Sequence, residues 1–559
     1  MIKHNRIKIV SGLLMLYLLT LVATLSASGQ QQPQRERRAV PQSSPVPSAT
    51  PQTVTTPGPT PLPTASPVAR ATSTTTKTLE ELKARITEVL QKPELAAAIV
   101  AIKVVSLDTG RTMFEENAGT LLRPASNMKI YTVAAALDRL SPDYRFNTSV
   151  YAPTRPDAAG ILHGDLTIYG RGDPSIAARF SNGDYFVRIN ELASQIAAAG
   201  VKRVEGDLIG DETYFIGPKY GSGWAWEDLQ WWYGAEVSAL TINDNALDLS
   251  IKPGPAVARP AIISTGPPDP LLTIVNRVTT GPKASKRDLI IHRPLTTDVL
   301  EISGSIPIDD RGYTRSVAIS HPGLLFVYLL RASLAQRGVI ITGKTRTLPP
   351  LSYATTTALT NPSLIEIASL QSPPLSLVAA QTLKPSQNLY TELILRTLGR
   401  VVPVPPSPNS SDIARTSEDA GLQVVKSFLQ EAGVNSSGLD LSDGSGLSRD
   451  NMITADSSVR LLTYMNRHRY ATAFREALPV AGVDGTLRNR MKGTLAENNV
   501  RAKTGTLRSA ASLSGYLTTA AGEKLVFSII VNNFPTDVDP TSVCIDPIAV
   551  LLASFAGRS

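Results

Sequence analysis

One serine in the chain has a lysine three residues after it, at the predicted start of a helix. Residues 126–129 read Ser-Asn-Met-Lys, closely following Pro124. A spacing of three places the hydroxyl of Ser126 and the ammonium of Lys129 on one helical face, one turn apart. A serine alcohol needs an adjacent base, and a lysine supplies one when burial or neighbouring cations lower its pKa. Taken alone, the pair is better explained as a helix-capping serine and a solvated lysine.

A second serine, Ser386, lies two residues before Asn388, between two helical stretches within 376–400. Its hydroxyl can relay a proton between a lysine and a leaving group, and the amide can hold a substrate carbonyl. Ser407-Pro408-Asn409 has the same spacing but lies in a proline-rich loop. Ser386 is preferred, because a helix predicted to follow it directly can hold it in place.

A third segment reads Lys503-Thr504-Gly505-Thr506, on a predicted strand near the C-terminus. Glycine lets a substrate lie close against a strand edge. The lysine supplies positive charge, and the hydroxyls can bind a carboxylate. As a lone segment, it is equally an ordinary turn at the end of a strand.

In this order, the three segments resemble the motif set of penicillin-binding proteins and serine β-lactamases. Ser386 follows Ser126 by 260 positions, and Lys503 follows Ser386 by 117. The long first gap resembles the class C low-molecular-mass penicillin-binding proteins, the D-alanyl-D-alanine carboxypeptidase/endopeptidase family S13, in which an insert separates the first two motifs. The resemblance covers residues 80–559 and extends to segments 170–175, 224–247, 372–375, 443–449 and 482–487.

The resemblance implies a serine-type D-alanyl-D-alanine carboxypeptidase or endopeptidase that acts on peptidoglycan stem peptides, needs no cofactor and is inhibited by penicillins and other β-lactams. Ser126 would be the nucleophile and Lys129 the base. Ser386, held beside Lys129, would pass a proton to the departing D-alanine.

The resemblance also implies how the substrate is bound. Asn388 would hydrogen-bond its acyl side, and Lys503 would supply electrostatic stabilisation. Thr504 and Thr506 would bind the terminal carboxylate, with Gly505 between them in the same strand. The backbone N–H groups of Ser126 and Thr506 would form the oxyanion hole.

The predicted fold class is α/β: a penicillin-binding transpeptidase-like domain, with an antiparallel sheet between helix layers, interrupted by a β-rich insert. The catalytic domain is expected to comprise residues 78–155 and 345–559, and the insert residues 156–344. Three β-rich runs near the C-terminus predict consecutive antiparallel strands at 500–504, 512–518 and 524–532.

The N-terminus predicts export. Three basic residues precede an apolar run from about Ile9 to Leu25, and small residues follow it. Residues 1–29 are therefore expected to be a cleaved signal peptide, with a retained membrane anchor as the alternative. Residues 30–77 contain ten prolines and no aromatic residue, which predicts a disordered linker. We expect a location in the periplasm or cell-wall space.

The net charge of +8 lies almost entirely in this N-terminal part. Residues 1–77 hold 8 of the 55 basic residues and one of the 47 acidic residues. The remaining chain is nearly neutral, with 47 basic and 46 acidic residues, so no nucleic-acid partner is predicted. Oligomeric state is left open.

Several other features have an ordinary structural explanation. The five histidines lack metal-ligand spacing, so no metal site is predicted, and a Ser-His-Asp triad is disfavoured. The Arg-Gly-Asp sequence at 171–173 and the glycine-rich run at 443–448 both predict turns, and a place at the border of the active-site cleft is the further possibility for the second. Four tryptophans at 224–232 predict core packing, with an exposed cell-wall-binding patch as the alternative.

Two other functions share the motifs. A serine β-lactamase is disfavoured by the long insert and by the lack of a deacylating glutamate in a recognisable loop. A non-catalytic wall-binding protein with the same fold is disfavoured because all three motifs are intact.

Overall fold

The computed structural model describes residues 76–294, 297–351, 363–403 and 415–559. The predicted signal peptide at 1–29, nearly all of the predicted linker at 30–77 and the competing Ser407 motif lie outside these ranges. Among the described residues, no helix combines the length and apolarity that a membrane span requires.

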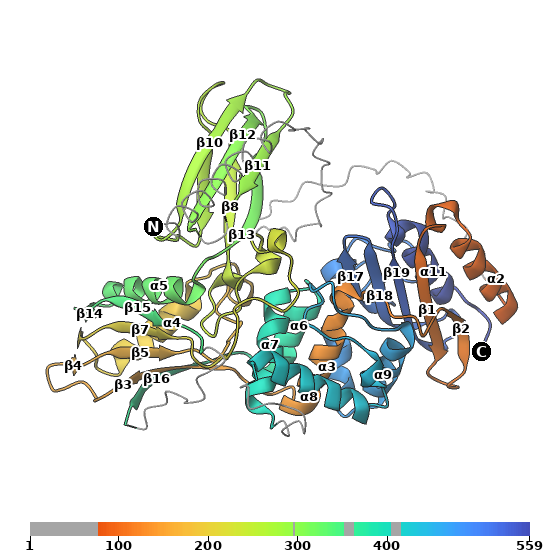
Figure 1. The fold of residues 1–559 in the computed structure, drawn as a ribbon, viewed down its shortest axis with the longest axis horizontal. Coiled ribbons are helices and arrows are strands. Elements are labelled where there is room, and N and C mark those ends of the chain that lie inside the picture. The colour runs from red at the N-terminus through yellow and green to blue at the C-terminus, as the bar shows by residue number, and fades with distance from the viewer. Residues whose placement is uncertain (1–75, 295–296, 352–362, 404–414) are drawn as a thin grey trace, which may run out of the picture. The chain divides into compact units, whose positions relative to one another are not determined.

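A five-stranded antiparallel sheet joins the two ends of the described chain, in the order β17-β18-β19-β1-β2 (Figure 1). The strands predicted at 500–504, 512–518 and 524–532 are confirmed as its consecutive strands β17, β18 and β19. Strand β17 therefore forms one edge of the sheet. The bounds are β1 Ile99–Ser106, β2 Thr112–Glu116, β17 Arg501–Leu507, β18 Ala510–Thr518 and β19 Lys524–Asn532.

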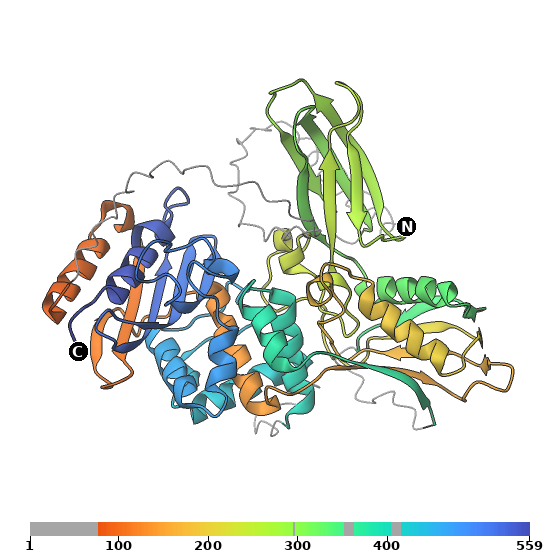
Figure 2. The same ribbon diagram turned by 180° about the vertical axis from the view of Figure 1, so that it is seen from behind.

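Both faces of this sheet are buried, which explains the nearly continuous apolar run of β1. Val100, Ile102 and Val104 pack with helices α2 (Leu79–Leu90) and α11 (Asp546–Ala553). Ala101, between them, faces the opposite core. Successive side chains of a strand point to opposite faces, so one apolar strand serves two layers. Figures 1 and 2, which are opposite views, show α2 and α11 on the same side of the sheet.

The second core is mainly helical. The helix predicted from Ser126 to Leu140 forms as a short 3-10 turn at Ala125–Asn127 that continues into α3. The helical stretch within 376–400 forms two helices, α6 and α7, with Ser386 in the turn between them. The bounds are α3 Met128–Leu140, α6 Leu375–Leu383, α7 Asn388–Val401, α8 Ser417–Glu431, α9 Ala455–Arg467 and α10 Ala471–Ala477.

Sequence reasoning missed helices α8, α9 and α10, although two of them carry a recognisable start signal. Thr416 caps α8 and is capped in return by Asp419. Thr454 and Ser457 form the same reciprocal arrangement at the start of α9. A Thr-x-x-Asp or Thr-x-x-Ser pattern before an apolar-periodic segment is therefore the signal that identifies both helices.

The middle of the chain forms a second mixed sheet, in the order β15-β7-β5-β3-β16. Strand β15 pairs in parallel with β7, and β7 with β5, whereas β3 pairs antiparallel with β5 and β16. Helices α4 and α5 pack on it, and sequence reasoning predicted only α5. The bounds are β3 Asn147–Ala152, β5 Leu166–Tyr169, β7 Leu208–Asp211, β15 Thr345–Leu348, β16 Ile365–Gln371, α4 Val187–Ala198 and α5 Pro322–Gln336.

Three smaller sheets complete the fold, with orders β14-β6-β4, β13-β8-β9 and β10-β12-β11. The last two use only strands between residues 246 and 318. The described chain is thus a mixed α/β protein with several sheets, which indicates an inserted domain. The bounds are β4 Ile161–His163, β6 Arg203–Glu205, β8 Ala246–Lys252, β9 Ile262–Gly266, β10 Thr273–Gly281, β11 Asp288–His292, β12 Val299–Pro307, β13 Tyr313–Ala318 and β14 Ile340–Ile341.

Candidate active site

Ser126 and Lys129 meet at the start of α3, as their spacing predicts. Lys129 Nζ lies 2.9 Å from Ser126 Oγ. The lysine is fully buried, whereas the serine is partly exposed. Ala125, just before the serine, has a φ of +48°, a left-handed conformation that is uncommon for residues other than glycine. The chain therefore presents Ser126 to solvent on a sharp turn, with its potential base buried beneath it.

Lys129 has two further acceptors around its amine. Nζ donates to Asn388 Oδ1 at 2.6 Å and to the backbone oxygen of Ser445 at 2.7 Å. Burial lowers the pKa of Lys129 to about 7, although the nearby carboxylates of Asp443 and Glu392 act in the opposite direction. An amine with a pKa near neutrality can accept a proton from a serine hydroxyl and return it later.

Lys503 forms a second lysine–serine pair in the same site. Its Nζ donates to Ser386 Oγ at 2.8 Å and to the backbone oxygen of Thr504 at 2.8 Å. Burial, together with the positive charges of Lys129 and Arg490, holds the pKa of Lys503 well below its ordinary value. The resemblance implied that Ser386 is held beside Lys129, but the hydrogen bond that the structure has at Ser386 is to Lys503.

The turn between α6 and α7 leaves Ser386 partly exposed, whereas Asn388, at the start of α7, is buried. Ser386 has a φ of +65° and is partly exposed. The side chain of Gln387 accepts the N–H of Leu389 and so caps α7. Asn388 is buried, with Oδ1 on Lys129 and Nδ2 donating to the backbone oxygen of Tyr233 at 2.8 Å. Its amide therefore links the catalytic lysine candidate to a residue of the predicted insert.

Strand β17 brings the third motif to the edge of the sheet. Thr504 Oγ1 donates to Thr486 Oγ1 at 2.7 Å, and Thr506 is exposed. At Gly505 a Cβ would lie 2.2 Å from Ser512 Oγ and 2.5 Å from the backbone oxygen of Pro124. The structure thus explains this glycine by its packing against the segment that leads into Ser126. The eight predicted site residues lie at the start of α3, in the turn between α6 and α7, at the first residue of α7 and on β17.

The sequence predicted a turn at residues 443–448, with a place at the border of the active-site cleft as a further possibility, but it predicted no specific contact. The Ser445 backbone oxygen touches Lys129, and Gly446 has a φ of +80°. A Cβ at Gly446 would lie 1.9 Å from the backbone oxygen of Ala125, so only glycine fits beside the nucleophile's turn. The glycine-rich composition was the available signal. A contact made by a backbone carbonyl does not require a particular residue type, so the sequence could not predict it.

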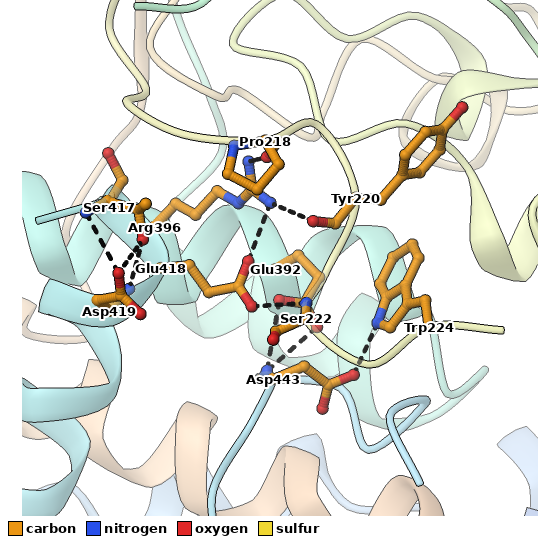
Figure 3. A network of polar contacts seen from close by, with 12 residues as sticks. Pro218, Tyr220, Ser222, Trp224, Glu392, Arg396, Ser417, Glu418, Asp419 and Asp443 are labelled. Atoms are coloured by element: carbon orange, nitrogen blue, oxygen red, sulfur yellow. Dashed lines mark hydrogen bonds and ion pairs between the residues drawn. The ribbon is translucent and has the colours of Figure 1, made fainter. Parts of the chain in front are cut away.

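The predicted insert reaches the site through a buried polar network (Figure 3). Trp224 Nε1 donates to Asp443 Oδ2 at 2.9 Å, so this tryptophan has a polar partner beyond simple packing. Arg396 pairs with Glu418 at 3.1 Å and donates to the backbone oxygen of Pro218 at 2.7 Å. The four tryptophans do not share one environment, because Trp226 is 66% exposed.

Two other observations concern the rest of the described chain. No group of three or more His, Cys, Asp or Glu residues that could hold a metal ion occurs in the described ranges.

A cavity of about 880 Å³ lies beside β1, β2 and α9, away from edge strand β17, and none of the eight predicted site residues lines it.

Comparison with known proteins gives matches over most of the chain. The family model described as the D-Ala-D-Ala carboxypeptidase 3 (S13) family matches residues 82–555. A D-alanyl-D-alanine carboxypeptidase from Actinomadura sp. is 35% identical over 492 residues, which cover 86% of this chain and 86% of that protein. The D-alanyl-D-alanine carboxypeptidase DacB from Haemophilus influenzae is 25% identical over 438 residues, covering 77% and 85%.

Solved structures also resemble this one. The crystal structure of penicillin binding protein 4 from Haemophilus influenzae has a TM-score of 0.67 at 22% identity and covers 84% of this chain and 97% of its own. The same protein in complex with a β-lactam has a TM-score of 0.64 at 21% identity, covering 85% and 97%. At these identities the likeness establishes a shared fold.

Proposed function

Because the chain belongs to the D-Ala-D-Ala carboxypeptidase 3 (S13) family of serine peptidases, we propose that it hydrolyses D-Ala-D-Ala in peptidoglycan stem peptides through an acyl-enzyme on Ser126. The observation that most directly supports this assignment is the contact of 2.9 Å between Ser126 Oγ and Lys129 Nζ. It joins a partly exposed hydroxyl to a buried amine whose pKa lies near 7.

Acylation begins with the unprotonated Lys129. Its amine takes the hydroxyl proton while Ser126 Oγ bonds to the carbonyl carbon of the penultimate D-alanine. When the C–N bond breaks, the leaving D-alanine amine needs a proton. Ser386 donates its hydroxyl proton to that nitrogen and regains one from Lys503, 2.8 Å away. Before deacylation, Lys129 releases the proton taken from Ser126 to solvent and Lys503 regains one from solvent. The neutral Lys129 then takes a proton from a water molecule as that water attacks the ester, and it returns the proton to Ser126 Oγ when the ester bond breaks and the shortened peptide leaves.

Substrate binding is assigned to edge strand β17 and the start of α7. Lys503 provides positive charge, and Thr504 and Thr506 bind the terminal carboxylate of the substrate. Gly505 keeps this strand close to the turn that carries Ser126. Asn388 contacts the acyl side of the substrate. Backbone N–H groups of Ser126 and Thr506 stabilise the oxyanion.

The proposed architecture and location follow from the same assignment. The proposed catalytic domain is penicillin-binding transpeptidase-like and comprises residues 78–155 and 345–559, with residues 156–344 as its β-rich insert. Strands β3, β15 and β16 lie close to these proposed boundaries and pair in one sheet with β5 and β7 of the insert. The protein acts after export, in the periplasm or cell-wall space, with residues 1–29 as a signal peptide or anchor. The family's cell-wall substrate supports this location.

Penicillins are the proposed inhibitors, because they carry a reactive amide that Ser126 can open and a carboxylate for the same site. The Haemophilus influenzae relative has been solved with a β-lactam bound, which supports this proposal. The penicilloyl ester on Ser126 is expected to hydrolyse slowly.

A fluorescent penicillin tests the assignment. Wild-type protein should become stably labelled, Ser126→Ala should not, and Ser437→Ala, at an exposed serine that is not among the eight predicted site residues, should label normally. No labelling of the wild type would refute the proposed function, whereas rapid loss of the label would identify a β-lactamase. D-alanine release from a pentapeptide, compared with cleavage of a crosslinked dimer, separates carboxypeptidase from endopeptidase activity.

A further inference from the structure

One buried carboxyl group beside the site has no part in the steps above. Glu392 is fully buried on α7, four residues after Asn388 and therefore on the same helical face. It accepts the backbone N–H of Ser445 at 2.8 Å and that of Gly444 at 3.1 Å. A buried carboxyl group is costly, so two backbone donors aimed at it indicate a built contact.

The segment held by Glu392 contacts Lys129 and the residue that precedes Ser126. Within residues 443–446, the Ser445 backbone oxygen accepts from Lys129 Nζ at 2.7 Å. Gly446 packs so closely against the backbone of Ala125 that it has no room for a side chain. A displacement of this loop would therefore move an acceptor of the base and press on the turn of the nucleophile.

The shape of the loop and its place are fixed by different contacts. Asp443 accepts the N–H groups of Gly446 at 2.7 Å and Ser448 at 2.9 Å, bonds that lie within the loop and set its shape. The position of the loop is fixed by hydrogen bonds with residues outside it. Thr132 Oγ1 on α3 donates to the Gly444 backbone oxygen at 2.9 Å, Trp224 bonds Asp443, and Glu392 holds the loop to α7.

We propose that Glu392 is a positioning residue for the acylation step: it fastens loop 443–446 to α7 so that the Ser445 oxygen and Asn388 Oδ1 hold Lys129 Nζ against Ser126. Helix α7 then positions two acceptors of Lys129. It carries Asn388 itself, and through Glu392 it holds the loop that presents the Ser445 oxygen. This inference rests on the proposed function, because it assigns Lys129 the role of base.

The role requires an acceptor and does not require a negative charge. Burial, followed by the charges of Asp443 and Glu418, raises the pKa of Glu392 to about 8, against the smaller opposing effects of its hydrogen bond with Ser445 and of Arg396. Burial thus disfavours the ionised form of Glu392, and it also lowers the pKa of Lys129 against the opposing charges of Asp443 and Glu392. An amide oxygen at position 392 can accept the same backbone bonds.

Three variants of the full chain test the proposal through acylation by a fluorescent penicillin, with the limiting rate and the half-saturating concentration measured separately. Glu392→Gln keeps an acceptor, and Glu392→Met keeps the length of the side chain but removes the acceptor. Val425→Ala is a matched control for lost stability, because Val425 is fully buried in the same core on α8. Thermal unfolding is recorded for each, and Glu392→Ala replaces Glu392→Met if the latter does not fold.

We expect Glu392→Met to lower the limiting acylation rate by about tenfold or more with little change in half-saturation, since a base moved by a fraction of an ångström reacts poorly. Glu392→Gln should stay within about threefold of wild type, and Val425→Ala should keep the wild-type rate. A wild-type rate in the variant without an acceptor, or equal losses in Glu392→Gln and Glu392→Met, would overturn the inference while leaving the proposed function intact. No acylation of wild type would overturn both.

Discussion

Lys503 Nζ donates a hydrogen bond to Ser386 Oγ at 2.8 Å, so the second serine of the site is paired with the second lysine. Ser126 and Lys129 form the other pair, at 2.9 Å. Both lysines are fully buried, and the positive charge of Lys129 helps to lower the pKa of Lys503. Each hydroxyl therefore has its own neighbouring amine. In the proposed mechanism, this pairing separates the deprotonation of the nucleophile from the protonation of the leaving group.

This pairing predicts that Ser386→Ala slows D-alanine release by about 10²-fold or more, because the leaving amine loses its proton donor. The measurement is kcat on a stem pentapeptide. Ser407→Ala is the matched control, since it changes the serine of the competing Ser-x-Asn motif, and its kcat should equal that of wild type. The opposite outcome, a loss only in Ser407→Ala, would transfer the role to the competing motif.

The lowered pKa of Lys129 predicts a pH dependence of acylation. Its amine is a base only when unprotonated, so the rate of penicillin acylation should rise with pH through the pKa of about 7. Lys129→Met should remove this ascending limb together with most of the rate. A wild-type rate that stays constant from pH 5 to 8.5 would contradict the role of Lys129.

The same shift predicts a change in stability with pH. Lys129 has an ordinary pKa of 10.5 when exposed in the unfolded chain and about 7 in the folded protein. Between these values the unfolded state binds more protons, so this group makes the wild type more stable as pH rises. Relative to Lys129→Met, the wild-type Tm should increase from pH 7 to pH 10. A relative decrease would mean that folding raises the pKa of this lysine.

The packing of Gly505 predicts that Gly505→Ala is destabilising by about 1–3 kcal/mol, as expected for a group forced into a packed interior. Its Cβ would lie 2.2 Å from Ser512 Oγ and 2.5 Å from the Pro124 backbone oxygen. Penicillin labelling of Gly505→Ala should also fall, because the new methyl group would displace Pro124, which leads into the turn that carries Ser126. Gly119→Ala is the control: nothing lies within 4 Å of its Cβ, so the free energy of unfolding and the labelling should both remain unchanged.

The buried ion pair of Arg396 and Glu418 gives a prediction about the link to the predicted insert. Arg396→Met should lower the free energy of unfolding by about 3–5 kcal/mol, because it strands a buried carboxylate. It also removes the donor to the Pro218 backbone oxygen. Adding Glu418→Gln should recover part of the loss in urea unfolding. If the double variant is less stable by the full sum of the two single changes, the two residues do not interact.

Much of the fold followed from apolar periodicity and turn residues. The central sheet strands, helix α3 and the break between α6 and α7 were predicted from such local patterns. Helices α8, α9 and α10 were missed, although Thr416 and Thr454 start two of them with visible capping signals. The pairing order of the strands was not accessible in this way, because strands β1 and β19 lie more than 400 residues apart and meet only in the folded chain.

The sequence by itself determined which residue types the site contains and in what order. A spacing of three on a helix brings Ser126 and Lys129 together wherever that helix forms, because it is a local property of the backbone. The tertiary structure alone decided the partners of each amine. Ser386 bonds Lys503, and the backbone oxygen of Ser445 completes the surroundings of Lys129. Backbone atoms are the same in every residue, and burial depends on the whole fold, so neither these partners nor the lowered pKa values could be read along the chain.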